Sequence, residues 1–306
     1  MLDPRHLQAL SAVLETGGFD KAARKLFLTQ SAISQRIRQL EEQLGQPVLT
    51  RTSPVDATAA GRKLLQHYRQ LSLMEGELMS ALGPESAEQA FTTLAVGVNN
   101  DSMATWFLEA AAPVIRSRRL LLDIAMDDQD YTHELMRSGH VAGCVGTKPT
   151  PIQGGECHFL GSMRYLCLAT PGFAEDYFPQ GVNADALSRA PAIVFSRKDD
   201  LHHQFLQQET GYDGPYPHFL LPTPQGFVEA TRLGLAYSLL PELMIGDDLQ
   251  QGRLVDLLPG RYVDLPLWWH HWRVESSLAR ELAEALVRYG KTHLQQGLAA
   301  PSRGGD

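Results

Sequence analysis

The N-terminal region constrains the fold most, because its apolar spacing predicts two helices separated by a very tight turn. Asp20 is placed to cap a short helix over residues 21–26, and a turn of about three residues follows. A third helix begins at Thr29 or Gln30 and ends at Leu44, where a glycine follows as the C-terminal cap. Its apolar residues return at helical spacing and predict one buried face. Two helices around such a turn predict a helix-turn-helix.

A first helix precedes this pair and a wing follows it. Asp3-Pro4 is a helix-start signal, because Asp caps free amides and Pro tolerates the first helical position. Gly17-Gly18 ends that helix. Residues 47–52 predict a short β-hairpin wing, which would place Arg51 beside a sugar-phosphate backbone. We therefore expect an α+β head, a winged helix-turn-helix DNA-binding domain over residues 1–57.

Short polar and amide side chains occupy the outward face of the third helix, mostly at its N-terminal end. Such side chains reach base edges in a major groove, and a helix N-terminus meets a phosphate. The predicted DNA-contacting residues are Gln30, Ser31, Ser34, Gln35, Arg38 and Arg51. Any amphipathic helix has a polar face, but here the caps, the turn, the wing and the local charge agree on DNA binding.

The distribution of charge separates this head from the rest of the chain. Residues 1–70 carry ten Lys and Arg against six Asp and Glu, a net charge of +4. The remaining residues carry 17 against 29, so the whole chain has a net charge of −8. A basic head on an acidic body indicates that the head meets a polyanion and that the body has a different task.

The residues from Ala22 to Glu41, AARKLFLTQSAISQRIRQLE, resemble the signature of LysR-type transcriptional regulators. Leu44-Gly45 and residues 58–61 fit the usual continuation of that signature. Ser31 stands where many members have Pro, and residues 17–20 lack the hydroxyls of a common Gly-Ser-Phe-Thr-like run. The second departure removes one customary hydroxyl contact to phosphate.

A long linker helix is expected after the head. Thr58 can cap a helix that continues to about Met79, and residues 84–88 read as a hinge, so linker and hinge cover residues 58–90. One apolar stripe follows the helix: Leu64, Leu65, Tyr68, Leu71 and Leu78. The stripe packs either on a second identical helix or on its own chain. The family resemblance implies a linker-helix dimer that places two heads on two half-sites.

Strands alternate with helices over residues 91–306, which predicts an α/β fold with a parallel sheet. In lobe I the expected strands are 91–98, 120–126 and 141–145, with helices over 102–114 and 131–136. The resemblance implies a two-lobed, periplasmic-binding-protein-like effector-binding domain. Its lobe I would cover residues 91–162 and 264–306, and its lobe II residues 163–263.

Ligands in such folds bind near the carboxyl ends of strands and at helix N-termini, so the cleft residues are those that follow the predicted strands. The candidates are Asn99, Asp101, Ser102, Asp127, Asp128, Thr147, Phe195 and Thr223. The acidic run at residues 127–130 has two interpretations: a solvated loop that caps the next helix, or a seat for a cationic ligand.

A closer resemblance favours the cationic ligand. Residues 98–106, Asp127-Asp128, 199–202, 205–208 and 226–228 look like the branch of the family that activates basic amino-acid exporters. This similarity implies lysine or arginine as effector and an exporter promoter as target. Donors such as Asn99, Ser102 and Thr147 would face the ligand carboxylate, and acceptors such as Asp101, Asp127 and Asp128 its cationic groups.

Other chemistry finds little support. His202-His203 and His270-His271 are adjacent pairs whose side chains point in different directions, and Cys157-His158 lacks the partner spacing of a zinc site. No phosphate loop, nucleophile elbow or His-Glu-x-x-His motif occurs in the sequence. We therefore expect no enzyme, no metal and no cofactor. With three scattered cysteines, no secretory signal and no long apolar run, we expect a cytoplasmic, nucleoid-associated protein.

Two classes of function remain. The first is a ligand-responsive transcription factor, answering to a basic amino acid or to another small molecule. The second is a solute-binding or catalytic α/β protein that carries a helical head. The polar face of the third helix and the missing export signal favour the first. Expected partners are double-stranded promoter DNA, the effector, further copies in a homodimer or homotetramer, and RNA polymerase; a membrane is not expected.

Overall fold

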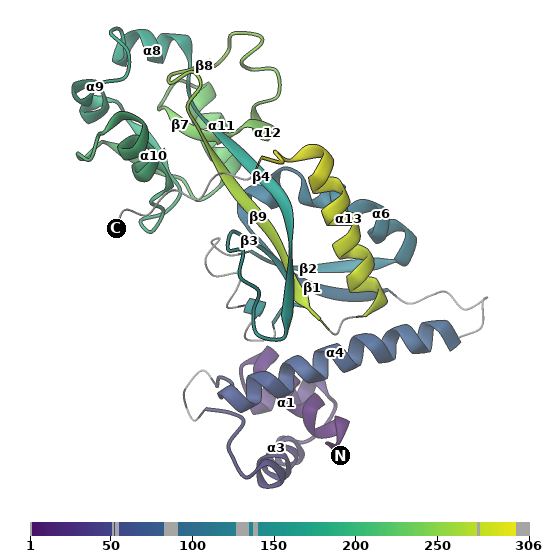
Figure 1. Cartoon of the computed structure of the whole chain (residues 1–306). Helices are drawn as coiled ribbons and strands as arrows, with labels where there is room; N and C mark the ends of the chain where they lie inside the picture. The colour runs from purple at the N-terminus through teal and green to yellow at the C-terminus, as the bar shows by residue number, and fades with distance from the viewer. Residues whose placement is uncertain are drawn as a thin grey trace.

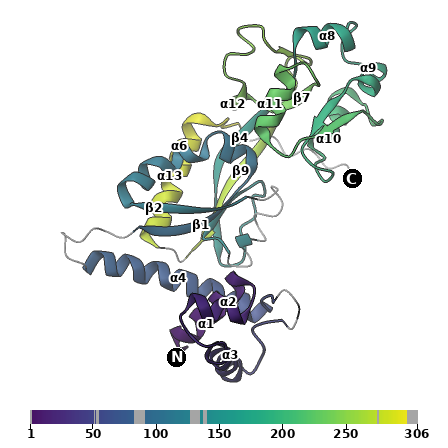
Figure 2. The same cartoon turned by 180° about the vertical axis from the view of Figure 1, so that it is seen from behind.

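The computed structural model describes residues 2–50, 52, 55–82, 91–126, 135–136, 140–273 and 276–297. A helical head is joined by one long helix to a two-lobed α/β body (Figure 1). The head lies at one end of the molecule and lobe II at the other, with lobe I between them in both views (Figures 1 and 2).

Local capping signals define the first and third helices of the head. In α1 (Pro4–Thr16) the Asp3 carboxylate accepts from a first-turn amide at 2.9 Å. In α3 (Gln30–Leu44) the Thr29 hydroxyl oxygen accepts from the Ala32 amide at 3.2 Å. Left-handed glycines end both helices. These boundaries confirm the two predicted helices.

The second helix differs from the prediction. α2 (Phe19–Lys25) begins two residues early, so Gly18 occupies the cap position and Asp20 lies inside the first turn. The predicted Asp20 cap was wrong, because Phe19 packs against the head core and is drawn into the helix. In the turn that follows, Phe27 adopts a left-handed φ of 55° and its side chain is 95% exposed.

The wing closes later in the chain than the sequence suggested. Leu49 forms an antiparallel bridge with Ala57, and the Thr50 amide donates to the Asp56 carbonyl at 2.7 Å. The returning arm therefore lies beyond the predicted range of 47–52. Arg51 lies outside the described residues.

The linker helix α4 (Ala59–Leu82) starts against the wing. The Thr58 hydroxyl donates to the Pro47 carbonyl at 2.8 Å and accepts from the Gly61 amide at 3.1 Å, which confirms Thr58 as the cap. Gly61 lies so close to the Val48 carbonyl that a Cβ atom would collide with it. Glycine at position 61 is thus what allows the helix to pack directly on the wing.

The apolar stripe of α4 has two halves with different surroundings. Leu65 is fully buried, and Leu64 and Tyr68 pack against the head core, so the first half is covered by its own chain. In the second half of α4, Leu78 of the stripe is exposed together with Met74, Met79 and Leu82, and these four residues are 45–72% accessible. The first half of the helix therefore packs on its own chain, whereas packing of the second half on a second copy stays a prediction.

One mixed sheet of seven strands connects the lobes within the described residues, in the order β2-β1-β3-β9-β4-β7 with β8 beside β4. Lobe I contributes β1 (Thr92–Val98), β2 (Leu120–Met126), β3 (Gly143–Gly146), α5 (Asn100–Ala104), α6 (Phe107–Arg118) and α13 (Ser277–His293). The long strands β4 (Gly155–Ala169) and β9 (Tyr262–Trp272) run antiparallel from one lobe into the other (Figure 1). The predicted lobe boundaries fall within these two strands.

Lobe II lies around the upper ends of β4 and β9 in Figure 1. Its other elements are α8 (Pro171–Tyr177), α9 (Ala184–Arg189), β5 (Ala192–Val194), α10 (Leu201–Thr210), β6 (His218–Leu220), α11 (Pro224–Arg232), β7 (Ser238–Pro241), α12 (Glu242–Ile245) and β8 (Val255–Asp256). The strands β5 and β6 form a separate parallel pair.

Several expectations for the body need correction. Within the seven-stranded sheet of the described residues, only β1 with β2 and β1 with β3 pair in parallel, whereas β3–β9 and β4–β9 are antiparallel, so this sheet is mixed rather than parallel. The predicted helix over 102–114 is two helices, because the chain bends at Thr105 and Trp106, where the buried indole enters the core. Most of the predicted helix over 131–136 lies outside the described residues.

A buried carboxylate in lobe II links the end of α11 to the segment that precedes β8. Asp248 is 0% exposed, and its two oxygens accept from Arg232 Nε at 2.7 Å and Arg253 Nε at 2.5 Å. Burial alone would raise the pKa of Asp248, but the hydrogen bonds and positive charges of Arg253 and Arg232 outweigh it, so the pKa lies below its usual value.

We expect Asp248→Asn to lower the unfolding free energy at pH 7 by about 1.5–3 kcal/mol, the usual worth of hydrogen bonds to charged groups. Because the folded-state pKa is depressed, this stability is present above the unfolded pKa of about 4 and is lost as pH falls through the folded value. The deficit of the variant should therefore shrink below about pH 4. Urea denaturation followed by tryptophan fluorescence measures it, since all four Trp lie in residues 106–272.

The exposed neighbour Asp247 provides the matched control, and Asp247→Asn should leave the denaturation midpoint unchanged. Equal loss in the two variants, or a deficit that persists unchanged at pH 3, would contradict the assigned role of Asp248.

Candidate functional site

The polar face of α3 is the first candidate site. Gln30, Ser31, Gln35 and Arg38 are exposed and Ser34 is half-buried. Ile33, Ile37 and Leu40 are buried on the opposite face against the head core. The helix lies at the end of the molecule that points away from the body (Figures 1 and 2).

The N-terminus of α3 has its own local order. The Thr29 hydroxyl lies 3.0 Å from the Ser31 hydroxyl in addition to capping the helix. The remaining free amides and the helix dipole favour an anion there, as at other helix N-termini that meet phosphate. Gln35 and Arg38 lie further along the helix on its exposed face, and their side chains are of the kinds that read base edges in a major groove.

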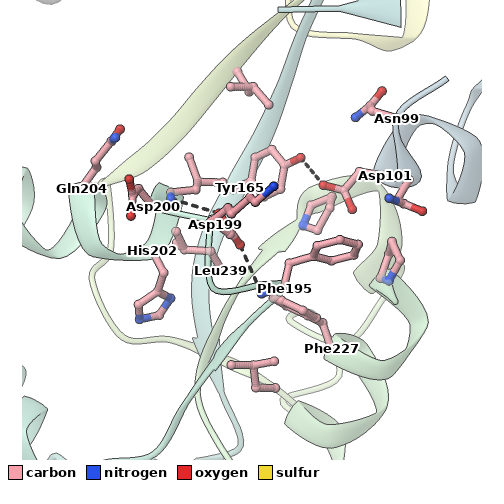
Figure 3. Close-up of a pocket in the computed structure, with 17 residues that line it drawn as sticks. Asn99, Asp101, Tyr165, Phe195, Asp199, Asp200, His202, Gln204, Phe227 and Leu239 are labelled. Atoms are coloured by element: carbon pink, nitrogen blue, oxygen red, sulfur yellow. Dashed lines mark hydrogen bonds between the residues drawn. The ribbon is translucent and has the colours of Figure 1, made fainter. Parts of the chain in front are cut away.

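The second candidate site is a cavity of about 350 Å³ between the lobes (Figure 3). Lobe I supplies the residues at the start of α5, the long strands supply one wall, and lobe II supplies the loop before α10 and the start of α11. The lining residues are Asn99, Asn100, Asp101, Tyr165, Ile193, Phe195, Lys198, Asp199, Asp200, Leu201, His202, Gln204, Pro224, Phe227, Leu239, Pro241 and Leu265.

Three carboxylates reach this cavity from two directions. Asp101 comes from lobe I, and its Oδ2 accepts from the Tyr165 hydroxyl at 2.5 Å. Asp199 comes from lobe II, where it accepts from the backbone amides of Phe195 at 3.2 Å and Leu201 at 3.1 Å. Asp200, next to it, is exposed. Figure 3 shows Asp101 and Asp199 on either side of the Tyr165 ring.

The environment of Asp101 is unusual for a carboxylate. Burial raises its pKa above the ordinary value, and the negative charge of Asp199 adds to this effect, while the hydrogen bond from Tyr165 opposes it. A cation in the cavity would relieve both unfavourable contributions at once. A neutral ligand carries no positive charge that could compensate these two carboxylates.

Polar atoms beside the carboxylates lack hydrogen-bond partners among the described residues. Asn99 is 2% exposed, and neither its Nδ2 nor its Oδ1 is bonded; the Ser102 hydroxyl, fully buried, is in the same state. Orphaned buried polar groups are costly, so they indicate a place where a ligand or water completes the network. Asn99 lines the cavity, and its amide can donate to a carboxylate.

Burial also determines the protonation state of His202, which packs against Tyr216 and Tyr237. Desolvation lowers its pKa to about 3, so the imidazole is neutral at physiological pH and adds no positive charge to the cavity.

The sequence candidates are only partly brought together. Asn99, Asp101 and Phe195 line the cavity. Ser102 is buried without being part of the lining, and Thr147 is not part of it either.

Thr223 also lies outside the lining, and its hydroxyl oxygen caps α11 by accepting from the Gly226 amide at 3.0 Å. Asp127 and Asp128 lie outside the described residues.

The cavity also contains polar residues that the sequence reasoning did not select. Asp199 and Asp200 belong to residues 199–202, one of the segments that carried the family resemblance. That segment is the sequence signal that could have identified them. Nothing local distinguished Tyr165, which lies in the middle of a strand and meets Asp101 only through the fold.

Comparison with known proteins covers both sites. Residues 4–62 match the family described as "Bacterial regulatory helix-turn-helix protein, lysR family", and residues 87–291 match "LysR substrate binding domain". The HTH-type transcriptional regulator ArgP of Pseudomonas fluorescens (strain Pf0-1) is 43% identical over 288 residues, which cover 94% of this chain and 97% of that protein.

Two solved structures are similar over nearly their full lengths. ArgP from Mycobacterium tuberculosis has a TM-score of 0.86 at 35% identity, covering 97% of this chain and 100% of that one. Full-length LysG from Corynebacterium glutamicum with bound effector Arg has a TM-score of 0.79 at 32% identity, covering 96% and 99%. Within the described residues of the present chain, no helix is long and apolar enough to cross a membrane.

We expect Gln35→Ala to relax sequence preference at one base position, costing about 1–3 kcal/mol there. Arg51→Ala should weaken binding to all DNA and reduce the salt dependence by about one unit of log-log slope, as for one lost phosphate contact. Competition gel-shift assays at several salt concentrations separate the two effects. Gln8→Ala, an exposed change on α1, is the control. If Gln35→Ala and Arg51→Ala weakened specific and non-specific binding equally, the assigned reading face would be incorrect.

Proposed function

The chain belongs to the LysR family of bacterial transcriptional regulators, and we propose that it senses arginine or lysine in the cavity between its lobes. The observation that carries this proposal is the convergence of Asp101, Asp199 and Asp200 on one cavity that also holds the orphaned amide of Asn99. The bound Arg named for the LysG structure is consistent with it.

The charge of the lining matches a basic amino acid. Three carboxylates face the cavity against one ammonium group, that of Lys198. Arginine and lysine each bring two cationic groups and one carboxylate. Their cationic groups would pair with Asp101 and with the Asp199-Asp200 loop, and their carboxylate would accept from the Asn99 amide.

The size and the walls of the cavity fit the same ligand. A volume of about 350 Å³ lies at the small end of the range for ligand pockets, suited to an amino acid. Phe195, Phe227 and Leu265 provide apolar surface for the methylene chain between the charged ends. A short neutral amino acid would leave one set of carboxylates desolvated and unpaired.

The sequence named Asp101, Asp127 and Asp128 as acceptors for the cationic groups of the ligand. Asp101 lines the cavity, whereas Asp127 and Asp128 lie outside the described residues. In the present proposal, Asp101 and Asp199 take that role, because they contact the cavity from opposite lobes. A ligand bound between them would stabilise the present arrangement of the lobes, since both carboxylates reach the cavity in it.

The output side of the function is proposed from the linker helix and from the family resemblance. The exposed apolar residues in the second half of α4, which include Leu78 and Leu82, support packing on a second copy, as a homodimer or within a homotetramer. Two heads would then bind two half-sites of a promoter. We propose a basic amino-acid exporter gene as target and a contact with RNA polymerase at that promoter, both on the resemblance to the exporter-activating branch.

We expect the full-length protein to bind L-arginine or L-lysine and to bind norleucine poorly. Asp101→Asn and Asp199→Asn should each weaken binding of the basic ligand roughly 10- to 100-fold, the loss of one charge-assisted contact of about 1.5–3 kcal/mol. Both variants should also lose part of their discrimination against norleucine. Isothermal titration calorimetry with the three amino acids provides the measurement.

Asp185→Asn serves as the control, because Asp185 is an exposed carboxylate of lobe II that pairs with Arg189. Its affinities should equal those of the wild type. Equal affinity for all three amino acids, or binding of neither basic one, would overturn the cationic effector and favour a regulator of the same family with a different small-molecule effector.

A further inference from the structure

A second group of ligating side chains lies on the long strands, away from the cavity. Glu156 and His158 are two residues apart on β4, so they point to the same face of the sheet. His271 on β9 is paired directly with Glu156 and shares that face. One carboxylate oxygen and one nitrogen from each imidazole all lie within 4.8 Å of one another. We call Glu156, His158 and His271 the strand cluster.

The strand cluster contains a histidine that is already oriented as metal ligands are. His271 is 6% exposed, and its Nδ1 lies 3.1 Å from the Trp272 backbone carbonyl. A carbonyl oxygen only accepts, so Nδ1 carries a proton, and Nε2 is the nitrogen through which the neutral ring would bind a metal. Metal-ligating histidines are typically held in this way, with one nitrogen donating to a backbone carbonyl or carboxylate.

The other two side chains have the freedom to complete a coordination sphere. His158 is exposed, and its ring stacks on that of His271 at a centroid distance of 5.1 Å. Glu156 is half-buried, and its Oε1 accepts from Arg273 Nε at 3.1 Å, which leaves Oε2 for a second partner. Ligand atoms around a tetrahedral zinc are roughly 3.3 Å apart, so side-chain rotation within the cluster is enough to reach that geometry.

We propose that Glu156, His158 and His271 bind one divalent transition-metal ion of the Zn²⁺ class. Two imidazoles and one carboxylate are a ligand set that zinc accepts, with water in the fourth position. Hard cations such as Mg²⁺ prefer oxygen ligands, so the two nitrogens argue against them. The guanidinium of Arg273 then remains beside the Glu156 carboxylate and orients it.

The strand cluster escaped the sequence reasoning, which predicted no metal site because it looked for ligands at local spacing. Here the third ligand lies 113 positions further along the chain from His158, and only the β4–β9 register brings it close. The cluster is also separate from the effector cavity. His158 and Tyr165 are seven positions apart on β4, a distance of about 23 Å along a strand.

A bound ion would join β4 to β9 near the ends that lie toward the head in both views. The proposal does not depend on the identity of the effector, because no residue of the strand cluster lines the cavity. Failure of either proposal would therefore leave the other in place.

The experiment is a Zn²⁺ titration of full-length protein, prepared without a histidine tag and stripped with a chelator, against a competing metal indicator. We expect one Zn²⁺ per chain. His158→Ala and Glu156→Gln should each weaken binding at least about 100-fold, the upper end of what losing even a supporting group costs a metal site. Both side chains are partly or fully exposed, so neither change should prevent folding. With Co²⁺ in place of Zn²⁺, visible ligand-field bands should appear in the wild type and be lost in both variants.

His218→Ala is the matched control, since His218 is an exposed strand histidine outside the strand cluster. It should bind Zn²⁺ as the wild type does. Absence of stoichiometric binding in the wild type would overturn the proposal. So would binding that both cluster variants retain, which would mean that the ion occupies another place on the surface.

Discussion

The antiparallel pairing of β4 with β9 is the interaction on which the rest of the body depends. These strands carry the chain from one lobe to the other, and their register decides which distant side chains meet. Tyr165 reaches the cavity from β4 and Leu265 from β9, so one wall of the effector site belongs to the connection itself. The register shifts between Phe159 and Gly161, where a glycine with φ 133° lies against Leu294. A side chain at position 161 would push the C-terminal segment off the sheet, because its Cβ would come within 2.5 Å of the Leu294 Cβ.

The head was largely predictable because its structure is specified by neighbours in sequence. Asp3, Thr29 and Gly45 define helix ends through contacts within a few residues, and those ends were confirmed. The predicted start of α2 was wrong because the position of Phe19 is determined by its packing against the head core rather than by the nearest capping residue. The same limit applied to the body. The first half of β4, from Gly155 onward, mixes polar and apolar residues and becomes a strand only through its partner β9, more than a hundred positions away.

The candidate site shows the same difference between residues defined by local sequence and residues defined by distant contacts. Asn99 and Asp101 were found because they directly follow a strand, a position that the fold class alone marks as close to a ligand. Tyr165 was not found, since its place in the site depends on a hydrogen bond to the Asp101 carboxylate, 64 positions earlier in the chain. Thr223 follows the rule for cleft residues equally well, but its hydroxyl is engaged in capping α11. A sequence shows which polar groups are near a cleft, whereas the number of their hydrogen-bond partners depends on the tertiary structure.

The close approach of Gly61 to the wing has a mechanical consequence. No side chain separates α4 from the wing, and Thr58 is hydrogen-bonded to both, so we expect the head and the first turns of α4 to move as a rigid unit. A helix of 24 residues is about 36 Å long, so it acts as a lever arm. A small rotation at its far end, where the body is attached, sweeps α3 through a wide arc. In a dimer, the distance between the two α3 helices would thus depend on the angle at which the two α4 helices cross. A promoter with fixed half-site spacing would then bind only those dimers in which this angle has the matching value.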